Sequence, residues 1–281
     1  MIGLQERLIC SSIHCMTSLS KTSARALVLL LLSGAMFPVF SDTKGNRGEA
    51  LQHLVPEILA IYPHDSKAFT QGLVFHQGRL YESTGLYGAS DLRRVELKTG
   101  KVTQRLRLND RFFGEGLALV GNRLIQLTWV EKTAFVYDLN TFALLESYRY
   151  ESEGWGLCFD GFYLYRSDGS HTLFRHDSHT FEMVGTLAIT MQGRALANLN
   201  ELACVGTHIY ANVYMTDTIV RIDKNSGRVT ARIDAANLLP ARERAALPAG
   251  ATLNGIAHDP EEDVFYLTGK LWPKLFKVRF R

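Results

Sequence analysis

The chain has 281 residues, and its 31 lysines and arginines nearly balance its 28 aspartates and glutamates, which leaves a net charge of +3. No run of like charges accompanies this small excess, so the composition excludes a nucleic-acid-binding stripe and indicates a mixed, solvated surface. Once an N-terminal leader is set aside, about 240 residues remain, which is the length of a single domain.

The leader is marked by an apolar segment at residues 26–40 (ALVLLLLSGAMFPVF), which follows a stretch containing lysine and arginine. This run is short for a membrane span, which needs about 20 apolar residues, and it ends on residues of the kind that a signal peptidase recognises. We therefore predict a cleaved secretory signal over residues 1–41, with Met16 as an alternative start and an uncleaved anchor as the alternative interpretation. Residues 42–54 are then a short linker, and the mature protein is expected to be secreted or periplasmic, without stable membrane association.

A predicted strand at residues 57–62 (EILAIY) precedes the first copy of a motif that recurs through the rest of the chain. Each copy is an apolar strand entered through Gly-Leu or a close substitute. We take residues 72, 116, 156, 201 and 255 as the anchor positions of the five copies. Aligned on these anchors, the copies recur at steps of 44, 40, 45 and 54 residues. The copies are FTQGLVF, FGEGLAL, EGWGLCF, NLNELAC and TLNGIAH. A period near 40 residues with short strands predicts a β-propeller.

After each motif the sequence predicts further strands, and four of the five repeats also contain a tight turn. A second strand follows each motif, and a third strand leads into a turn that begins with an acidic residue. The turns are at residues 96–100, 138–142, 177–181 and 223–227. Aspartate in such a turn can accept hydrogen bonds from the backbone that follows it. Residues 55–281 are therefore predicted to form an all-β, five-bladed propeller.

The fifth repeat ends at Arg281 without a fourth strand. Residues 57–62 precede the first motif in the same way that a fourth strand precedes each later one. We expect this N-terminal strand to complete the last blade and close the ring, because closure removes exposed strand edges.

Two cysteines lie in the predicted propeller, Cys158 and Cys204, on the innermost strands of neighbouring blades. We expect both to be buried free thiols, because neighbouring blades splay apart and disulfide geometry is narrow; a disulfide in an oxidising compartment is the alternative. The chain has no CxxC, no HExxH and no histidine pair at ligand spacing. No catalytic metal or other cofactor is therefore expected, and a structural cation is left open.

Equivalent positions of a propeller converge on the central funnel, so two rings of side chains can be read from the repeat. The residues just before the anchors are Gln71, Glu115, Trp155, Asn200 and Asn254. The residues 13 positions after the anchors, with two inserted residues in the last loop, are Gly85, Trp129, Gly169, Tyr214 and Lys270. Bulky groups beside glycines in the second ring indicate a pocket walled on one side and open on the other.

Glu115 is the single carboxylate of the first ring, between Gly114 and Gly116. In an aromatic funnel a carboxylate is partly desolvated, which raises its pKa and suits it to general acid/base catalysis. The alternative is a structural glutamate that accepts hydrogen bonds from neighbouring backbone amides.

The motifs FTQGL, YESTGLYG, FGEGLAL, EGWGLCFDG, LNELA and LNGIAHDP together resemble the plant and bacterial type of glutaminyl-peptide cyclotransferase, over about residues 55–281. The resemblance implies a five-bladed propeller that converts the N-terminal glutamine of peptides or proteins to pyroglutamate with loss of ammonia. It places the catalytic glutamate on Glu115. It places the substrate-binding aromatic and polar residues on Phe69, Phe113, Trp129 and Trp155, and on Gln71, Asn200 and Lys270. Tyr214 stands where the family commonly has tryptophan, so it is expected to wall the pocket with less area and an added hydroxyl.

Two other functions stay open from the residues alone. A metal-dependent propeller enzyme such as a lactonase needs several acidic ligands at the axis, where the alignment puts Glu115 and Glu201. A non-catalytic binding propeller would need no acid at Glu115.

Overall fold

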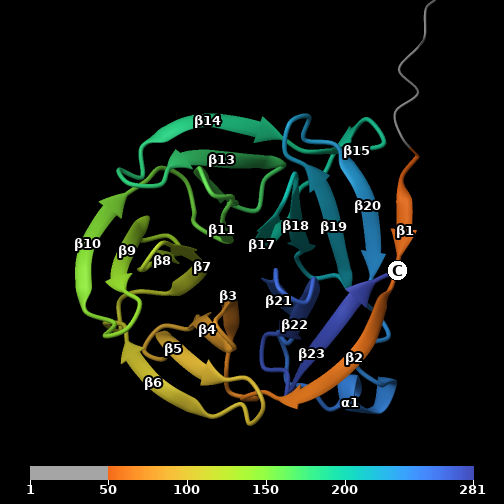
Figure 1. Ribbon diagram of the computed structural model, residues 1–281, viewed down its shortest axis with the longest axis horizontal. Helices are drawn as coiled ribbons and strands as arrows, with labels where there is room; N and C mark the ends of the chain where they lie inside the picture. The colour runs from red at the N-terminus through yellow and green to blue at the C-terminus, as the bar shows by residue number, and fades with distance from the viewer. Residues whose placement is uncertain (1–49) are drawn as a thin grey trace, which may run out of the picture. The chain divides into compact units, whose positions relative to one another are not determined.

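The computed structural model describes residues 50–281, so the predicted leader and the linker before residue 50 lie outside the described residues. Five sheets stand around a central axis, with the inner strands near the centre of Figure 1 and the outer strands at its rim. The predicted all-β, five-bladed propeller is confirmed. No helix in this part of the chain is long and apolar enough to cross a bilayer.

The first three blades each run from the inner to the outer strand in chain order. Blade 1 comprises β3 (Thr70–His76), β4 (Arg79–Thr84), β5 (Asp91–Glu96) and β6 (Val102–Arg107). Blade 2 comprises β7 (Gly114–Val120), β8 (Arg123–Thr128), β9 (Thr133–Asp138) and β10 (Leu144–Arg149). Blade 3 comprises β11 (Leu157–Phe159), β12 (Tyr163–Arg166), β13 (Thr172–Asp177) and β14 (Met183–Ala188).

The last two blades carry the additions that lengthen the repeat. Blade 4 comprises β17 (Leu199–Val205), β18 (His208–Val213), β19 (Thr218–Asp223) and β20 (Val229–Asp234). Blade 5 contains β21 (Leu253–Asp259), β22 (Val264–Gly269) and β23 (Lys274–Phe280). A small hairpin, β15 (Thr190–Met191) and β16 (Arg194–Ala195), precedes blade 4, and the short helix α1 (Ala241–Ala245) precedes blade 5. The segment that contains α1 accounts for the longest step of the sequence repeat.

The turns between third and fourth strands form as expected. Asp138 Oδ1 accepts the backbone N–H groups of Asn140 and Thr141 at 3.0 and 2.8 Å. Asp177 makes the same two bonds in blade 3, to residues 179 and 180. The aspartate at the start of these turns therefore fixes the hairpin locally.

The ring closes through the N-terminal segment. Strand β2 (Pro56–Pro63) pairs antiparallel with β23 and supplies the outer strand of blade 5, so the predicted closure is confirmed. Strand β1 (Gln52–Leu54) pairs in parallel with β20, the outer strand of blade 4. Residues 52–54 were expected to belong to a linker, and instead they tie blade 4 to blade 5.

Contact between inner strands explains why the motif carries glycine. A Cβ added at Gly72 would lie 2.4 Å from Leu117 N, and one at Gly116 would lie 2.5 Å from Leu157 N. Neighbouring inner strands therefore touch at these positions, and a side chain there would push two blades apart. Glycine at the anchor is a packing requirement of the ring.

Glu201 occupies the anchor position of blade 4 and is fully buried. Its Oε1 accepts the N–H of Leu73 in β3, and its Oε2 accepts the N–H of Ile256 in β21, both at 3.0 Å. One side chain thus holds the inner strands of three blades together. Because both carboxylate oxygens accept backbone hydrogen bonds, Glu201 has a structural role at the axis.

The expectation that Cys158 and Cys204 are free thiols is wrong. They form a disulfide with a Cα–Cα distance of 5.4 Å, between β11 of blade 3 and β17 of blade 4. A Cβ added at nearby Gly156 would lie 2.1 Å from Asn200 O, so these two inner strands are in contact at this level. Blades splay apart only farther from the axis, and the cysteines lie where the strands are closest.

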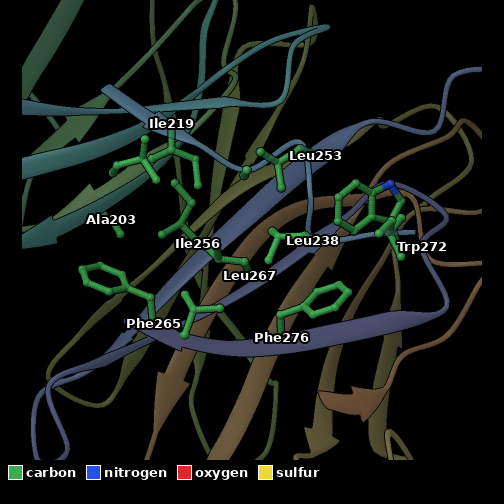
Figure 2. Packing of buried hydrophobic residues seen from close by; sticks show 13 residues of the cluster. Ala203, Ile219, Leu238, Leu253, Ile256, Phe265, Leu267, Trp272 and Phe276 are labelled. Carbon is green, nitrogen blue, oxygen red and sulfur yellow. The ribbon is translucent and has the colours of Figure 1, made fainter. Parts of the chain in front are cut away.

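Hydrophobic layers fill the spaces between blades. Figure 2 shows the layer between blades 4 and 5, in which side chains of β17 and β19 meet those of β21, β22 and β23. Leu238, from the segment before α1, and Trp272, from the β22–β23 loop, close this layer at one end. Such packing holds the blades at fixed angles, so the loops at the funnel keep fixed positions.

Candidate active site

A cavity lies where the inner strands begin and where the loops between second and third strands converge. It has a volume of about 260 Å³. Its lining residues are Phe69, Gln71, Leu86, Phe113, Glu115, Trp129, Trp155, Asn200, Tyr214 and Lys270. The structure therefore brings all nine residues predicted for the site to one cavity, and it adds Leu86.

Glu115 is the second residue of β7, the inner strand of blade 2, and is 5% exposed. Gln71 Nε2 donates a hydrogen bond to Glu115 Oε1 at 3.0 Å. Burial raises the pKa of the Glu115 carboxyl well above its usual range; Lys270 opposes this shift, and the carboxylates of Glu153 and Glu131 add to it. The cavity thus holds a carboxyl group that binds its proton more tightly than an exposed glutamate does, as a proton-transfer group requires.

Gln71 is itself held in place by the fifth member of the first ring. Asn254 Nδ2 donates to Gln71 Oε1 at 3.3 Å and to Thr70 O at 2.9 Å. Asn254 does not line the cavity, whereas Gln71 does. A line of hydrogen bonds therefore runs from blade 5 through Gln71 of blade 1 to Glu115 of blade 2, and it fixes the direction of the carboxyl group.

Lys270 follows the second strand of blade 5 and is 3% exposed. Its Nζ lies 4.9 Å from the ring centroid of Phe69 and 4.8 Å from that of Tyr214. Burial lowers the pKa of Lys270 to about 8, although the nearby Glu115 opposes the shift. Two aromatic faces thus hold a cation whose charge is sensitive to pH in the neutral to alkaline range.

Aromatic rings form the remaining walls of the cavity. Phe113 meets Trp129 edge to face with 5.6 Å between centroids, and Trp155 meets Tyr214 in the same way at 5.5 Å. Tyr214 therefore acts as a wall, as expected for the residue that replaces tryptophan.

The glycines of the second ring have a different place from the one expected. A Cβ at Gly85 would lie 2.3 Å from the Phe113 ring, and one at Gly169 would lie 2.6 Å from the Trp155 ring. Gly85 makes room for an aromatic side chain that precedes blade 2, and Gly169 makes room for one of its own blade 3. The opening of the cavity is therefore not made by the glycines, because aromatic side chains fill the space beside them.

Three acidic or phenolic residues at the site were not predicted. Glu153 Oε2 accepts the indole N–H groups of Trp129 and Trp155 at 2.6 and 2.9 Å. Glu131 accepts the Tyr87 hydroxyl at 2.7 Å and the backbone N–H of Phe113 at 3.3 Å. Glu153 has a sequence signal, since it stands two residues before Trp155 in the third motif, but it lies outside both rings.

Residues that could hold a metal ion are not gathered at this site. Across residues 50–281, no three or more histidine, cysteine, aspartate or glutamate side chains form such a group. Asn200 lines the cavity, and its Oδ1 is a buried hydrogen-bond acceptor that has no partner within the described residues.

A buried carboxyl group and a buried lysine, both with displaced pKa values in one small aromatic cavity, define a catalytic propeller. The chain belongs to the glutamine cyclotransferase family, whose model matches residues 29–280.

The chain is also similar to two known proteins, one compared by sequence and one by structure. The chain is 39% identical over 274 residues to the glutaminyl-peptide cyclotransferase of Arabidopsis thaliana, which covers 93% of this chain and 84% of that protein. Its structure is similar to the crystal structure of Myxococcus xanthus glutaminyl cyclase, with a TM-score of 0.78 and 40% sequence identity. That similarity covers 82% of this chain and 98% of the other.

Proposed function

We propose that this enzyme is a glutaminyl-peptide cyclotransferase, which cyclises the N-terminal glutamine of peptides or proteins to pyroglutamate and releases ammonia. The observation that carries the proposal is the buried carboxyl group of Glu115 in an aromatic cavity that also holds Lys270. The family and the Arabidopsis relative support the same reaction.

The size of the cavity suits this substrate. Pockets for drug-sized ligands usually measure about 300–1,000 Å³, and this cavity measures about 260 Å³. It therefore matches one amino-acid side chain with its α-amine, while the rest of a peptide extends outside. Confinement curls the glutamine side chain toward its own amine, which favours closure of a five-membered ring.

Glu115 supplies the proton transfers. The α-amine nitrogen attacks the side-chain carboxamide carbon, and Glu115 takes the proton that this nitrogen loses. The tetrahedral intermediate then collapses as the C–N bond to the former amide nitrogen breaks. Glu115 returns the proton to that nitrogen, which leaves as ammonia. The carboxyl group ends in its starting state, so one residue serves both steps.

The polar residues of the cavity have distinct roles in this proposal. Lys270 stabilises the negative charge that develops on the carboxamide oxygen. Asn200 Oδ1, buried without a partner in the described residues, accepts an N–H of the substrate. Gln71 already binds Glu115 and Asn254, so it orients the catalytic carboxyl group more directly than it orients the substrate.

The disulfide supports a proposal about the compartment. Disulfides persist mainly in oxidising compartments, and Cys158 and Cys204 are paired. We propose that the protein is exported and acts in the periplasm or outside the cell, as the predicted leader at residues 1–41 would require. Peptide mapping by mass spectrometry of the protein from its native host tests this, since export requires a mature N-terminus near residue 42.

The activity test incubates the purified protein with a dipeptide that begins with glutamine and assays ammonia. A matching dipeptide that begins with asparagine is the control, because its shorter side chain cannot close the five-membered ring. We expect ammonia from the glutamine peptide only. Absence of ammonia from a folded preparation would refute the proposed reaction.

Chelation provides a further prediction. The cavity offers amides, aromatic rings, a lysine and one carboxyl group, which is a poor set of ligands for a catalytic metal. Activity should therefore be unchanged after EDTA treatment. Complete loss that added zinc restores would place the enzyme in another mechanistic class.

A further inference from the structure

Glu153 lies outside the proposed proton transfer, yet it joins two walls of the cavity. Trp129 comes from the β8–β9 loop of blade 2, and Trp155 comes from the segment that leads into β11 of blade 3. Both indole N–H groups point to a single oxygen, Glu153 Oε2, at 2.6 and 2.9 Å. Because one oxygen at the end of this side chain accepts both N–H groups, its position constrains both rings.

The backbone around Glu153 is fixed on both sides. Gly154 N donates to Trp129 O at 3.2 Å, and Trp155 N donates to Ser167 O at 3.0 Å. The buried guanidinium of Arg166 donates to the carbonyl oxygen of Glu153 itself. A Cβ at Gly154 would lie 2.1 Å from Tyr150 Oη, so this segment also packs closely against blade 2. Glu153 therefore presents its carboxylate from a rigid support.

We propose that Glu153 is a positioning residue for substrate binding, which sets the two tryptophan walls at the separation that the glutamine side chain requires. The inference rests on the proposed function above. It assigns Glu153 no contact with the reacting atoms, because it acts through the indoles of Trp129 and Trp155. The reach of its side chain matters more than its negative charge.

Two substitutions separate reach from charge. Glu153→Gln keeps the length of the side chain and an acceptor oxygen but removes the charge. Glu153→Asp keeps the charge but withdraws the oxygen from the indoles by one methylene. We expect Glu153→Asp to raise KM for a glutamine-initiated dipeptide about tenfold or more, with a smaller change in kcat. Glu153→Gln should keep KM within about threefold of the wild-type value.

Intrinsic fluorescence gives a readout that does not depend on turnover. The chain has three tryptophans, and two of them line this cavity. Indoles released by Glu153→Asp gain contact with water, so emission of the ligand-free protein should shift to longer wavelength. The spectrum of Glu153→Gln should match that of the wild type. Glu151→Ala is the matched control, because Glu151 is exposed on the same segment and should leave both KM and emission unchanged.

The outcomes distinguish the proposal from its alternatives. A Glu153→Asp enzyme with wild-type KM and emission would overturn it. A Glu153→Gln enzyme impaired as much as Glu153→Asp would also overturn it, because charge would then matter more than position. If the wild-type enzyme released no ammonia, the proposed reaction would fail, whereas the emission spectra would still report whether Glu153 holds the indoles.

Discussion

At the scale of single residues, the surroundings of Glu115 decide its chemistry. Burial raises the pKa of its carboxyl group, and the Lys270 charge limits that rise. Gln71 directs one carboxyl oxygen by a hydrogen bond at 3.0 Å. A glutamate on the surface would stay ionised at neutral pH and would be a weak base, so burial is what suits this side chain to proton transfer.

Removing the proton-transfer group should lower turnover selectively. Glu115→Gln keeps the shape and the acceptor for Gln71, so the fold and substrate binding should be preserved. We expect kcat to fall by about 10²–10⁴-fold with little change in KM. By contrast, Trp129→Ala removes part of the cavity wall, so it should weaken substrate binding and raise KM in addition to lowering kcat. Steady-state kinetics on a glutamine-initiated peptide, with circular dichroism to confirm folding, provides the measurement; wild-type kcat in Glu115→Gln would make Glu115 structural.

The pH dependence of kcat/KM should be bell-shaped. Glu115 acts as a base only when ionised, and its pKa is raised, so activity should be lost on the acid side well above pH 4.5. Lys270 acts only as a cation, and its pKa is about 8, so activity should decline above that pH. The substrate α-amine, with a pKa of about 7.7–8.0, must be neutral and contributes to the acid limb.

Lys270→Met tests the assignment of the alkaline limb. At pH 7 this variant should lose about 10²–10³-fold in kcat, because the oxygen that gains charge loses its cation. The decline above pH 8 should disappear, since Lys270 is absent and the substrate α-amine, which titrates in the same range, becomes more reactive when it loses its proton. The acid limb should move to higher pH, because Lys270 no longer lowers the pKa of Glu115. A variant that kept the alkaline decline would show that another group causes it.

At the scale of strands, the inner ring depends on contacts between blades. Glycine anchors let the inner strands touch, and Glu201 replaces one anchor with a side chain that binds two other blades. The disulfide joins blades 3 and 4 in the same inner layer. Covalent and hydrogen-bonded links therefore supplement hydrophobic packing where the blades are closest.

Glu201→Gln should destabilise the protein without touching the cavity. The glutamine amide has one acceptor oxygen and one NH₂ group. Its NH₂ group would face one of the two backbone N–H donors, which would then be buried without an acceptor. We expect the free energy of unfolding to fall by about 1–3 kcal/mol. Urea denaturation measures this, and Glu182→Gln on the exposed β13–β14 turn is the control. Equal midpoints for the two variants would contradict the role of Glu201 at the axis.

At the scale of the whole molecule, the N-terminal segment turns an open row of blades into a ring. Strand β2 supplies the outer edge of blade 5, and β1 adds to blade 4. The backbone of Val55 also exchanges two hydrogen bonds with that of Arg281, at 2.8 and 3.0 Å. Stability of the ring therefore depends on residues that lie before the first repeat but pair with strands of the last two blades.

Stepwise truncation should reveal this dependence. Deletion through Ser41 should leave the melting temperature unchanged. Deletion through Val55 removes β1 and should lower it moderately. Deletion through Tyr62 removes most of β2 as well, exposes the edge of β23 and should abolish cooperative unfolding or cause aggregation. Thermal melts of the three proteins provide the measurement, and an unchanged melt for the longest deletion would refute closure by β2.

Much of the fold and site could be predicted because a propeller repeats. Equivalent positions must converge on one axis, so the period alone brought Gln71, Glu115, Trp155 and Asn200 to a common ring. The ring-closing strand followed from a missing fourth strand in the last repeat. The resemblance added Phe69 and Phe113, which the rings do not contain.

Other features depended on distances between blades, which the period does not specify. The pairing of Cys158 with Cys204 required the inner strands to touch, and the place of Gly85 beside Phe113 required the direction of an aromatic side chain. Glu153 belongs to neither ring of equivalent positions, and only side-chain packing brings its carboxylate to the indoles of Trp129 and Trp155. The repeat alone specifies which positions share a level of the funnel. Which side chains meet there depends on the folded ring, because these contacts form across blades and vary with the spacing between them.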